Sequence, residues 1–202
     1  MEFRGHDIMA DAYVPFAGRV HVRDAVARHY ADHGLPADGG ASLDWFSVRL
    51  GPVSIKLPNP PARKRAVFFH DVNHVVTGYN TTFSQGEMAI AGFEVGAGCG
   101  RYWIAWYINL CMFALGLVFC PRDLVAAYAR GRRSASIYKR PEDAAAIGAM
   151  TVDQVRALLQ LDQPAPGATL ADSCFFMAWS VAAAITLTIP VVLLIALVLQ
   201  RA

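Results

Sequence analysis

The chain has 202 residues, which is long enough for one domain with a sizeable core. Its formal net charge is only +2, so the composition gives no support for strong nucleic-acid binding. Hydrophobic residues make up 55% of the chain and charged residues only 17%. This apolar excess is concentrated in two runs, residues 102–120 and 173–200, which indicates membrane association or an unusually apolar core.

The first expected element is a short helix over residues 20–33. Apolar residues recur there at the helical spacing, and Gly34 follows as a stop signal. His29 and His33 lie one helical turn apart near its end, beside a loop that contains glycine. We expect this histidine pair to lie at a solvated helix terminus rather than in a binding site.

Residues 44–57 are expected to form a small β-hairpin. Apolar and polar residues alternate on both sides of Gly51-Pro52, which is a turn signal. The segment 58–61 contains three prolines and breaks this pattern. A helix is predicted to follow it and to end near Thr77-Gly78.

This helix carries the most informative motif of the chain, His70-Asp71-Val72-Asn73-His74. Two histidines at i and i+4 lie on the same side of a helix, so both imidazoles can bind one divalent metal ion. Glu87 lies on the next expected helix, where a helical hairpin would bring it over the histidines. Asp71 is expected to be a further ligand or to orient one. A pair of hydrogen-bonded core histidines is the alternative.

Downstream of the motif, a second helix is predicted to begin near Ser84. It would run through Glu87 and Glu94, which share one face because they are seven residues apart. Thr151-Val152-Asp153-Gln154 has the pattern of a capping box at the start of another helix. Residues 163–172 contain Pro-Ala-Pro-Gly and are interpreted as a linker.

The last apolar run, residues 173–200, has no charged residue and would be about 42 Å long as a helix. Because the hydrocarbon core of a bilayer is about 30 Å thick, we predict a transmembrane anchor, with a buried pair of core helices as the alternative. Residues 102–120 suit a core helix or a helix at the lipid surface, and a transmembrane helix remains the alternative. The basic cluster 130–133 would hold lipid phosphates or a substrate carboxylate, or form a solvated face.

Several short blocks in a fixed order give the chain a resemblance to the coenzyme Q (ubiquinone) biosynthesis protein 4 family. The resemblance covers about residues 45–162. The blocks are Leu57-Pro58-Asn59-Pro60, His70-Asp71-x-x-His74, Thr77-Gly78, Gly86-Glu87, Phe93-Glu94, Pro121-Arg122, Arg130-Gly131-Arg132-Arg133 and the segment 152–161.

The resemblance implies a mainly helical protein associated with a membrane. Members of this family act in the late, ring-modifying part of quinone synthesis. They have been linked to oxidative removal of the ring carboxylate with hydroxylation at that carbon, and to the organisation of partner enzymes. They bind a divalent metal, commonly taken as zinc. Carried over to this chain, the metal ligands are His70, Asp71, His74 and Glu87, with Asp71 and Glu87 as the catalytic residues.

We therefore predict a mainly α fold with a small β-hairpin near the N-terminus and a C-terminal transmembrane helix. The predicted organisation is an N-terminal extension with one helix, a metal-binding helical domain, a linker and a transmembrane anchor. In that order, these parts cover residues 1–44, 45–162, 163–172 and 173–200.

The predicted function is that of a membrane-associated metal-binding protein of ubiquinone biosynthesis that acts on a prenylated aromatic acid. The metal would polarise the ring carboxylate or position oxygen near the ring. The expected partners are this quinone precursor, membrane lipid and other quinone-biosynthesis enzymes, and a homodimer stays open. The expected location is the bacterial inner membrane, with the metal-binding domain in the cytoplasm.

Two alternatives leave open whether the chain is an oxidative decarboxylase or lyase. The first is a non-catalytic, lipid-binding scaffold that organises quinone-biosynthesis enzymes, with a metal that only stabilises the fold. The second is a metal phosphohydrolase built on the His-Asp doublet. That chemistry needs another upstream histidine and a downstream aspartate, for which the chain offers His29 or His33 and Asp123.

Overall fold

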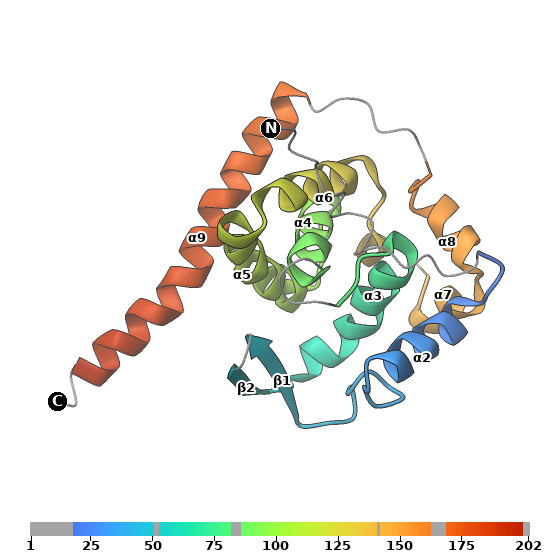
Figure 1. Ribbon diagram of the computed structural model, residues 1–202, viewed down its shortest axis with the longest axis horizontal. Coiled ribbons are helices and arrows are strands. Elements are labelled where there is room, and N and C mark those ends of the chain that lie inside the picture. Colours follow the sequence, from blue (N-terminus) through green and yellow to red (C-terminus); the bar gives the residue numbers. More distant parts are fainter. Residues whose placement is uncertain (1–17, 51–52, 82–85, 141, 163–168, 200–202) are drawn as a thin grey trace, which may run out of the picture.

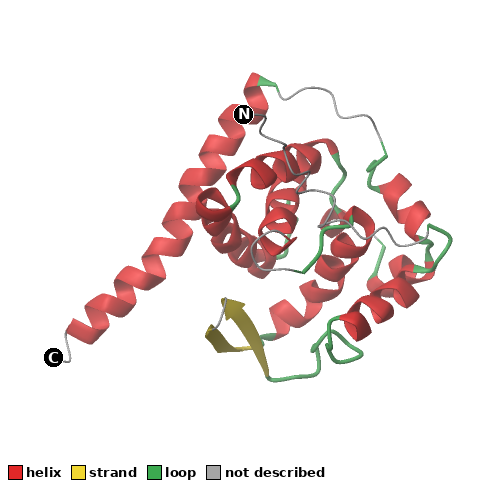
Figure 2. Cartoon of the chain, in the orientation of Figure 1, coloured by secondary structure: helices red, strands yellow, loops and turns green. Residues whose placement is uncertain are grey.

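The elements of the chain are mostly helices, with one two-stranded antiparallel sheet (Figures 1 and 2). The computed structural model describes residues 18–50, 53–81, 86–140, 142–162 and 169–199. The prediction of a mainly helical fold with a small hairpin is confirmed. In chain order the elements are α2 (Val22–Asp32), β1 (Trp45–Leu50), β2 (Val53–Pro58), α3 (Pro61–Thr77), α4 (Met88–Ala97), α5 (Trp103–Phe119), α6 (Pro121–Arg133), η2 (Ile137–Lys139), α7 (Ala144–Ala149), α8 (Val152–Leu158) and α9 (Leu170–Leu199).

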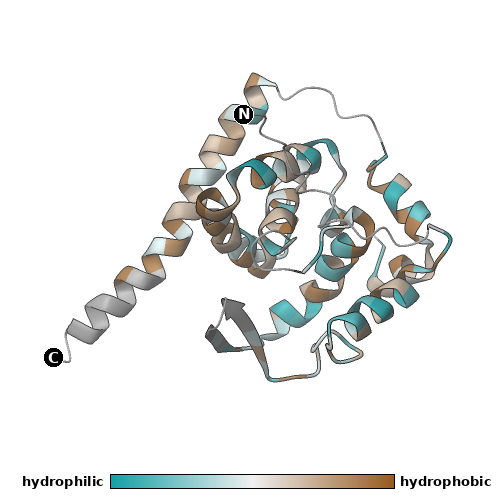
Figure 3. Cartoon of the chain, viewed as in Figure 1, coloured by the Kyte–Doolittle hydropathy of each residue, from teal (hydrophilic) through white to brown (hydrophobic). Residues whose placement is uncertain are grey.

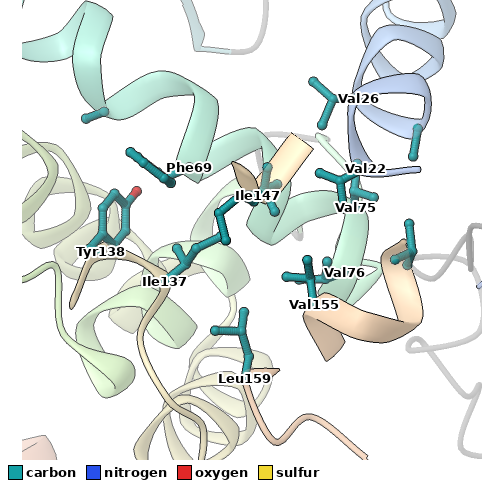
Figure 4. Close-up of a cluster of buried hydrophobic side chains, with 14 of the residues drawn as sticks. Val22, Val26, Phe69, Val75, Val76, Ile137, Tyr138, Ile147, Val155 and Leu159 are labelled. Carbon is teal, nitrogen blue, oxygen red and sulfur yellow. The ribbon is translucent and has the colours of Figure 1, made fainter. Parts of the chain in front are cut away.

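Helix α3 lies in the middle of the molecule and buries one side in the largest hydrophobic core (Figures 1 and 4). Phe69, Val75 and Val76 of α3 join Val26 of α2 and Val155 of α8 in this cluster of buried side chains. Another side of α3, which carries His70, lines a cavity. The core thus fixes the rotation of α3 about its axis, and with it the direction of the histidine side chains.

Both ends of α3 follow from local sequence. Pro61 occupies the first helical position, where the missing N–H costs nothing and the fixed φ angle suits a helix. Gly78 ends the helix in the left-handed conformation, with φ of 80°, and its N–H donates to the carbonyl oxygen of His74 at 2.9 Å. The predicted stop at Thr77-Gly78 is confirmed. The reversal of the chain brings the carbonyl group of Tyr79 back to the last turn of the helix.

Helices α4 and α6 approach each other closely because glycines lie where they touch. A Cβ atom on Gly131 would overlap the carbonyl group of Phe93, and one on Gly96 would overlap that of Tyr128. This close approach buries almost the whole of α4 and places Glu94 in the interior. The predicted beginning of this helix near Ser84 lies outside the described residues.

The smaller predicted elements agree with the structure in most respects. Strands β1 and β2 pair antiparallel, with Leu50 opposite Val53, and the predicted turn at Gly51-Pro52 lies outside the described residues. The predicted first helix is observed as α2. Thr151 and Gln154 form the predicted capping box, each side chain accepting from the other residue's N–H. Residues 163–168 of the predicted linker lie outside the described residues, and its last three residues belong to α9, which begins at Leu170. Thr169 and Asp172 cap its first turn by the same reciprocal bonds.

Helix α5 is a core helix on one side and an exposed apolar surface on the other. Asn109 and Phe113 are buried, whereas Trp103, Val118 and Phe119 are exposed. The helix has 17 residues, which is at the lower limit for crossing a bilayer, so the structure favours the core or surface alternative over a second transmembrane helix.

Helix α9 packs its first half on α5 and extends beyond the rest of the molecule (Figures 1 and 3). The indole rings of Trp106 and Trp179 stack with centroids 4.9 Å apart, and Phe176 packs against Phe113. Residues 170–189 are long and apolar enough to cross a membrane, and only 6% of the most apolar window is buried. The last apolar run therefore forms one long and mostly exposed helix, and not the alternative of a buried pair of core helices.

Candidate metal centre

Three side chains that the sequence predicts to be metal ligands meet at one point. His70 and His74 lie one turn apart on α3, and Glu87 immediately precedes α4. The Nε2 atoms of the two histidines are 3.2 Å apart. Each of them lies 3.6 Å from a carboxylate oxygen of Glu87. The structure therefore brings together a set of ligand atoms that lie within 4.8 Å of one another.

Hydrogen bonds on the far side of each imidazole ring decide which nitrogen carries the proton. Nδ1 of His74 lies 2.9 Å from the carbonyl oxygen of Tyr79, which can only accept, so Nδ1 is the donor. Nδ1 of His70 lies 3.1 Å from Glu94 Oε1, and a carboxylate also accepts. In the neutral rings, both Nε2 atoms therefore direct lone pairs toward each other and toward Glu87. Such an arrangement is repulsive unless a proton or a cation lies between them.

The spacing of the three ligand atoms suits a metal ion. Zinc binds imidazole nitrogen and carboxylate oxygen at about 2.0–2.2 Å in a tetrahedral arrangement, so neighbouring ligand atoms lie about 3.3–3.5 Å apart. The two Nε2 atoms are 3.2 Å apart, and the nitrogen–oxygen distances of 3.6 Å, from His70 to Oε2 and from His74 to Oε1 of Glu87, are close to this range. Three protein ligands leave the fourth position for water or substrate, which is the pattern of catalytic zinc sites.

Glu94 is the buried carboxylate that accepts the hydrogen bond from Nδ1 of His70. Its side chain is fully buried and accepts hydrogen bonds from Nδ2 of Asn73 at 2.7 Å and from the hydroxyl of Tyr138 at 3.0 Å. The side-chain amide of Asn109 on α5 donates to Oε2, the oxygen that also accepts from Tyr138. Burial raises the pKa of a carboxyl group, but His70 and these donors outweigh it and hold the pKa of Glu94 below its usual value. A carboxylate that accepts from a metal-binding histidine fixes its tautomer and orientation.

The sequence predicts only part of the hydrogen-bond network around Glu94. It placed Glu94 on the same face as Glu87, but it gave no role to Asn73, Asn109 or Tyr138. Asn73 lies inside the histidine motif, and Asn109 is an amide in the middle of an apolar run, which is a signal for a buried hydrogen bond. Tyr138 is 44 residues from Glu94, and no local pattern indicates that contact.

Asp71 lies apart from the three converging ligands. Its Oδ2 atom accepts a hydrogen bond of 2.6 Å from the hydroxyl of Tyr30 on α2, and both side chains are buried. It is not among the residues whose ligand atoms cluster within 4.8 Å. Burial raises the pKa of this carboxyl group, and the charge of His70 and the hydrogen bond from Tyr30 offset part of that increase. Its predicted role as a ligand stays a prediction, and the observed contact fits the other expectation, that Asp71 orients its surroundings.

The expectation that His29 lies at a solvated helix end is wrong. His29 is only 5% exposed, and its ring stacks on that of His74, with centroids 5.7 Å apart and an angle of 22° between the planes. Packing of α2 against α3 causes this burial, which helical periodicity alone does not reveal. Burial, together with His74, lowers the pKa of His29 to about 3, so its ring is neutral. His33, one turn further on, is exposed as expected.

A cavity of about 790 Å³ adjoins the three ligands. Among the described residues that line this cavity there is one arginine, Arg63, which lies in the first turn of α3. None of the basic residues at 130–133 is among the described residues that line it. Arg130 instead donates to the carbonyl oxygen of Thr77, and Arg132 pairs with Asp172. The cavity wall also includes apolar side chains, among them Phe46, Ala66, Val67, Ile104, Ile108 and Met112.

Metal binding at this centre is expected to release a proton. Burial alone would lower the pKa of His70, but Glu94 and Glu87 outweigh it and raise the pKa well above its usual value. Without a cation, His70 therefore holds a proton that a metal must displace, so apparent zinc affinity should fall about tenfold for each pH unit of acidification. Calorimetric titration in buffers of different ionisation enthalpy measures the proton directly. An affinity that does not change with pH and zero proton release would contradict this prediction.

The comparisons with known proteins leave the chain without an assigned family. No protein-family model, curated protein or solved structure matches it. The resemblance seen in the blocks around His70 and Glu94 therefore remains an interpretation of sequence motifs.

Proposed function

We propose that the chain binds a divalent metal ion, zinc by its ligand types, and acts on a prenylated aromatic acid in ubiquinone biosynthesis. The observation that carries this proposal is the convergence of His70, His74 and Glu87 beside a cavity with an apolar wall. Two nitrogen ligands and one carboxylate with an open position are typical of zinc sites that do chemistry. The family resemblance supplies the substrate class.

An apolar substrate at a membrane agrees with the surfaces around the cavity. Each methylene group moved from lipid into water costs about 0.8 kcal/mol, so a polyprenyl tail keeps its substrate in the bilayer. Helix α5 lines the cavity with Ile104, Ile108 and Met112, and it exposes Trp103 and Phe119 to the outside. We propose that α9 crosses the membrane and holds this side of the protein against it.

The side chains of the centre have distinct tasks in the proposed activity. His70 and His74 would hold the cation through Nε2, while Glu94 and the carbonyl group of Tyr79 keep these rings in the correct tautomer. Glu87 would supply the anionic ligand. The bound cation contributes Lewis-acid chemistry toward an oxygen of the substrate. Because zinc does not change its oxidation state, the oxidising equivalents for ring hydroxylation would come from dioxygen and a second protein.

We propose the cytoplasmic side of a bacterial inner membrane for the metal-binding domain. The support is the basic cluster 130–133 at the end of α6, since cytoplasmic segments next to membrane spans carry an excess of arginine and lysine. Arg132 pairs with Asp172 at the start of α9, which puts this cluster close to the proposed membrane entry.

The phosphohydrolase alternative has less support. It needs an upstream histidine and a downstream aspartate at the metal. His29 does lie against His74, but Asp123 is neither in the ligand cluster nor among the described residues that line the cavity. Phosphate release from nucleotides by the purified, metal-loaded protein would favour this alternative over the proposal.

Replacement of Glu87 by Gln tests catalysis against the scaffold alternative. The variant should be expressed in cells whose chromosomal copy is deleted, and quinone and its acid precursors should be measured by lipid extraction and mass spectrometry. We expect quinone to collapse and a carboxylated precursor to accumulate, because a neutral amide is a poor metal ligand. Asp153→Asn is the control, because it makes the same carboxylate-to-amide change at an exposed residue that is not among those lining the cavity, and it should restore quinone. Near-normal quinone with Glu87→Gln, at equal protein in the membrane fraction, would support the scaffold instead.

A further inference from the structure

Arg63 is held rigidly at the edge of the cavity. Its Nη1 atom donates to the side-chain oxygen of Asn59 at 3.1 Å, and its guanidinium carbon lies 3.9 Å from the centre of the Phe46 ring. Asn59 is itself buried and donates to the carbonyl oxygens of Gly40 and Leu43 at 3.0 and 2.8 Å. The guanidinium group is therefore positioned by the β-hairpin and the loop before it, which lie beside the start of α3 (Figure 1). Such a group loses little freedom when it binds a ligand.

The positive charge of Arg63 has no carboxylate partner among the residues that the structure describes. None of the ion pairs between described residues, all within 4 Å, includes Arg63. Its hydrogen bond to Asn59 uses one of five N–H donors. Asp71, whose charge acts on Arg63, accepts its hydrogen bond from Tyr30 instead. A partly buried guanidinium group with free donors is the side chain best suited to bind a carboxylate by two parallel hydrogen bonds.

The position of Arg63 along α3 relates it to the metal centre. Arg63 and His70 are seven residues apart, so they lie on the same face and about 10 Å apart along the helix axis. Ala66 and Val67 lie between them, are buried, and line the same cavity. A ligand along this face of α3 thus meets a positive charge, then an apolar floor, and then the three metal ligands.

We propose that Arg63 determines the specificity of the cavity for amphipathic organic acids by binding their carboxylate. The apolar body of the acid then lies over Ala66 and Val67 and reaches the centre formed by His70, His74 and Glu87. This inference rests on the proposed function, because it takes the same cavity as the substrate site. It assigns the acid group to Arg63 rather than to the basic cluster 130–133. An acid group held two turns from the metal also favours ring positioning over direct polarisation of the carboxylate.

Two probes that differ only in charge test the assignment. They are 4-butylbenzoate and the neutral, nearly isosteric 4-butylbenzamide, titrated calorimetrically into the zinc-loaded full chain in lipid nanodiscs. We expect the acid to bind about tenfold more tightly or better, because a charged, bidentate pair is replaced by a neutral amide. Equal affinities for the two probes in the unmodified protein would overturn the assignment without any variant.

Variants then show which residue causes the preference for the acid over the amide. Arg63→Gln should remove the preference for the acid and leave benzamide affinity within about twofold, while Arg63→Lys should retain part of the preference. Arg65→Gln is the matched control, because Arg65 is exposed on the same helix and the change in charge is the same. If the preference survives in Arg63→Gln, or is lost equally in Arg65→Gln, the assignment is wrong.

Metal content, measured on the same samples, separates this inference from the proposed function. Zinc that binds in stoichiometric amount without a preference for the acid contradicts only the role of Arg63. A preference for the acid that depends on Arg63, in a protein that takes up no zinc, contradicts the proposed metal chemistry and leaves the acid site in place.

Discussion

The His74→Ala variant is expected to lose zinc binding. His74 supplies one of three lone-pair donors, and the remaining pair, His70 and Glu87, cannot complete a tetrahedral site with protein ligands. Loss of a group that only supports a ligand typically lowers metal affinity by about 10- to 100-fold, so loss of a ligand should exceed that range. Competition with a chromophoric chelator gives the affinity, and elemental analysis of the dialysed protein gives the stoichiometry.

His33→Ala is the control for this variant. His33 is also a histidine at the end of α2, but it is exposed and lies outside the ligand cluster. It should bind zinc as the unmodified chain does. Zinc should also raise the midpoint of thermal unfolding of the control and not that of His74→Ala, since only a ligand that binds the folded state stabilises it. Unchanged zinc affinity in His74→Ala would show that these three residues are not a metal site.

The second large effect is expected at Glu94. Glu94→Ala should lower the free energy of unfolding by about 3 kcal/mol or more, because removal of one partner leaves buried polar groups unsatisfied. Those groups are the side chains of His70, Asn73, Asn109 and Tyr138. Zinc affinity should also fall by about 10- to 100-fold, because His70 loses the acceptor that fixes its tautomer.

Chemical denaturation of the full chain, followed by circular dichroism, measures the change in stability at Glu94. Asp153→Ala is the comparison, since Asp153 is 65% exposed and pairs only with Arg156 among the described salt bridges. It should cost less than about 1 kcal/mol. A double-mutant cycle of Glu94→Gln with Tyr138→Phe should show coupling between the two residues, because they share one hydrogen bond. Similar losses for Glu94→Ala and Asp153→Ala, or no coupling, would mean that this network contributes little.

Local patterns in the sequence predict the elements that carry the site. The spacing of His70 and His74 puts both side chains on one side of α3, since a helix has 3.6 residues per turn. Pro61 and Gly78 mark the ends of that helix through their own backbone preferences. The hairpin, the capping box at Thr151 and the long apolar helix are likewise consequences of neighbouring residues, and the structure agrees with each of them.

What packs on those elements is decided by contacts between residues far apart in the chain. Burial of His29 depends on how α2 lies on α3, and the hydrogen bonds of Glu94 depend on the close crossing of α4 and α6 and on a tyrosine 44 residues away. The orientation of Arg63 depends on Asn59 and Phe46 from the hairpin. Periodicity specifies which residues share a face, because it is a property of one helix. The tertiary structure alone specifies what that face meets, because that depends on the packing of several elements at once.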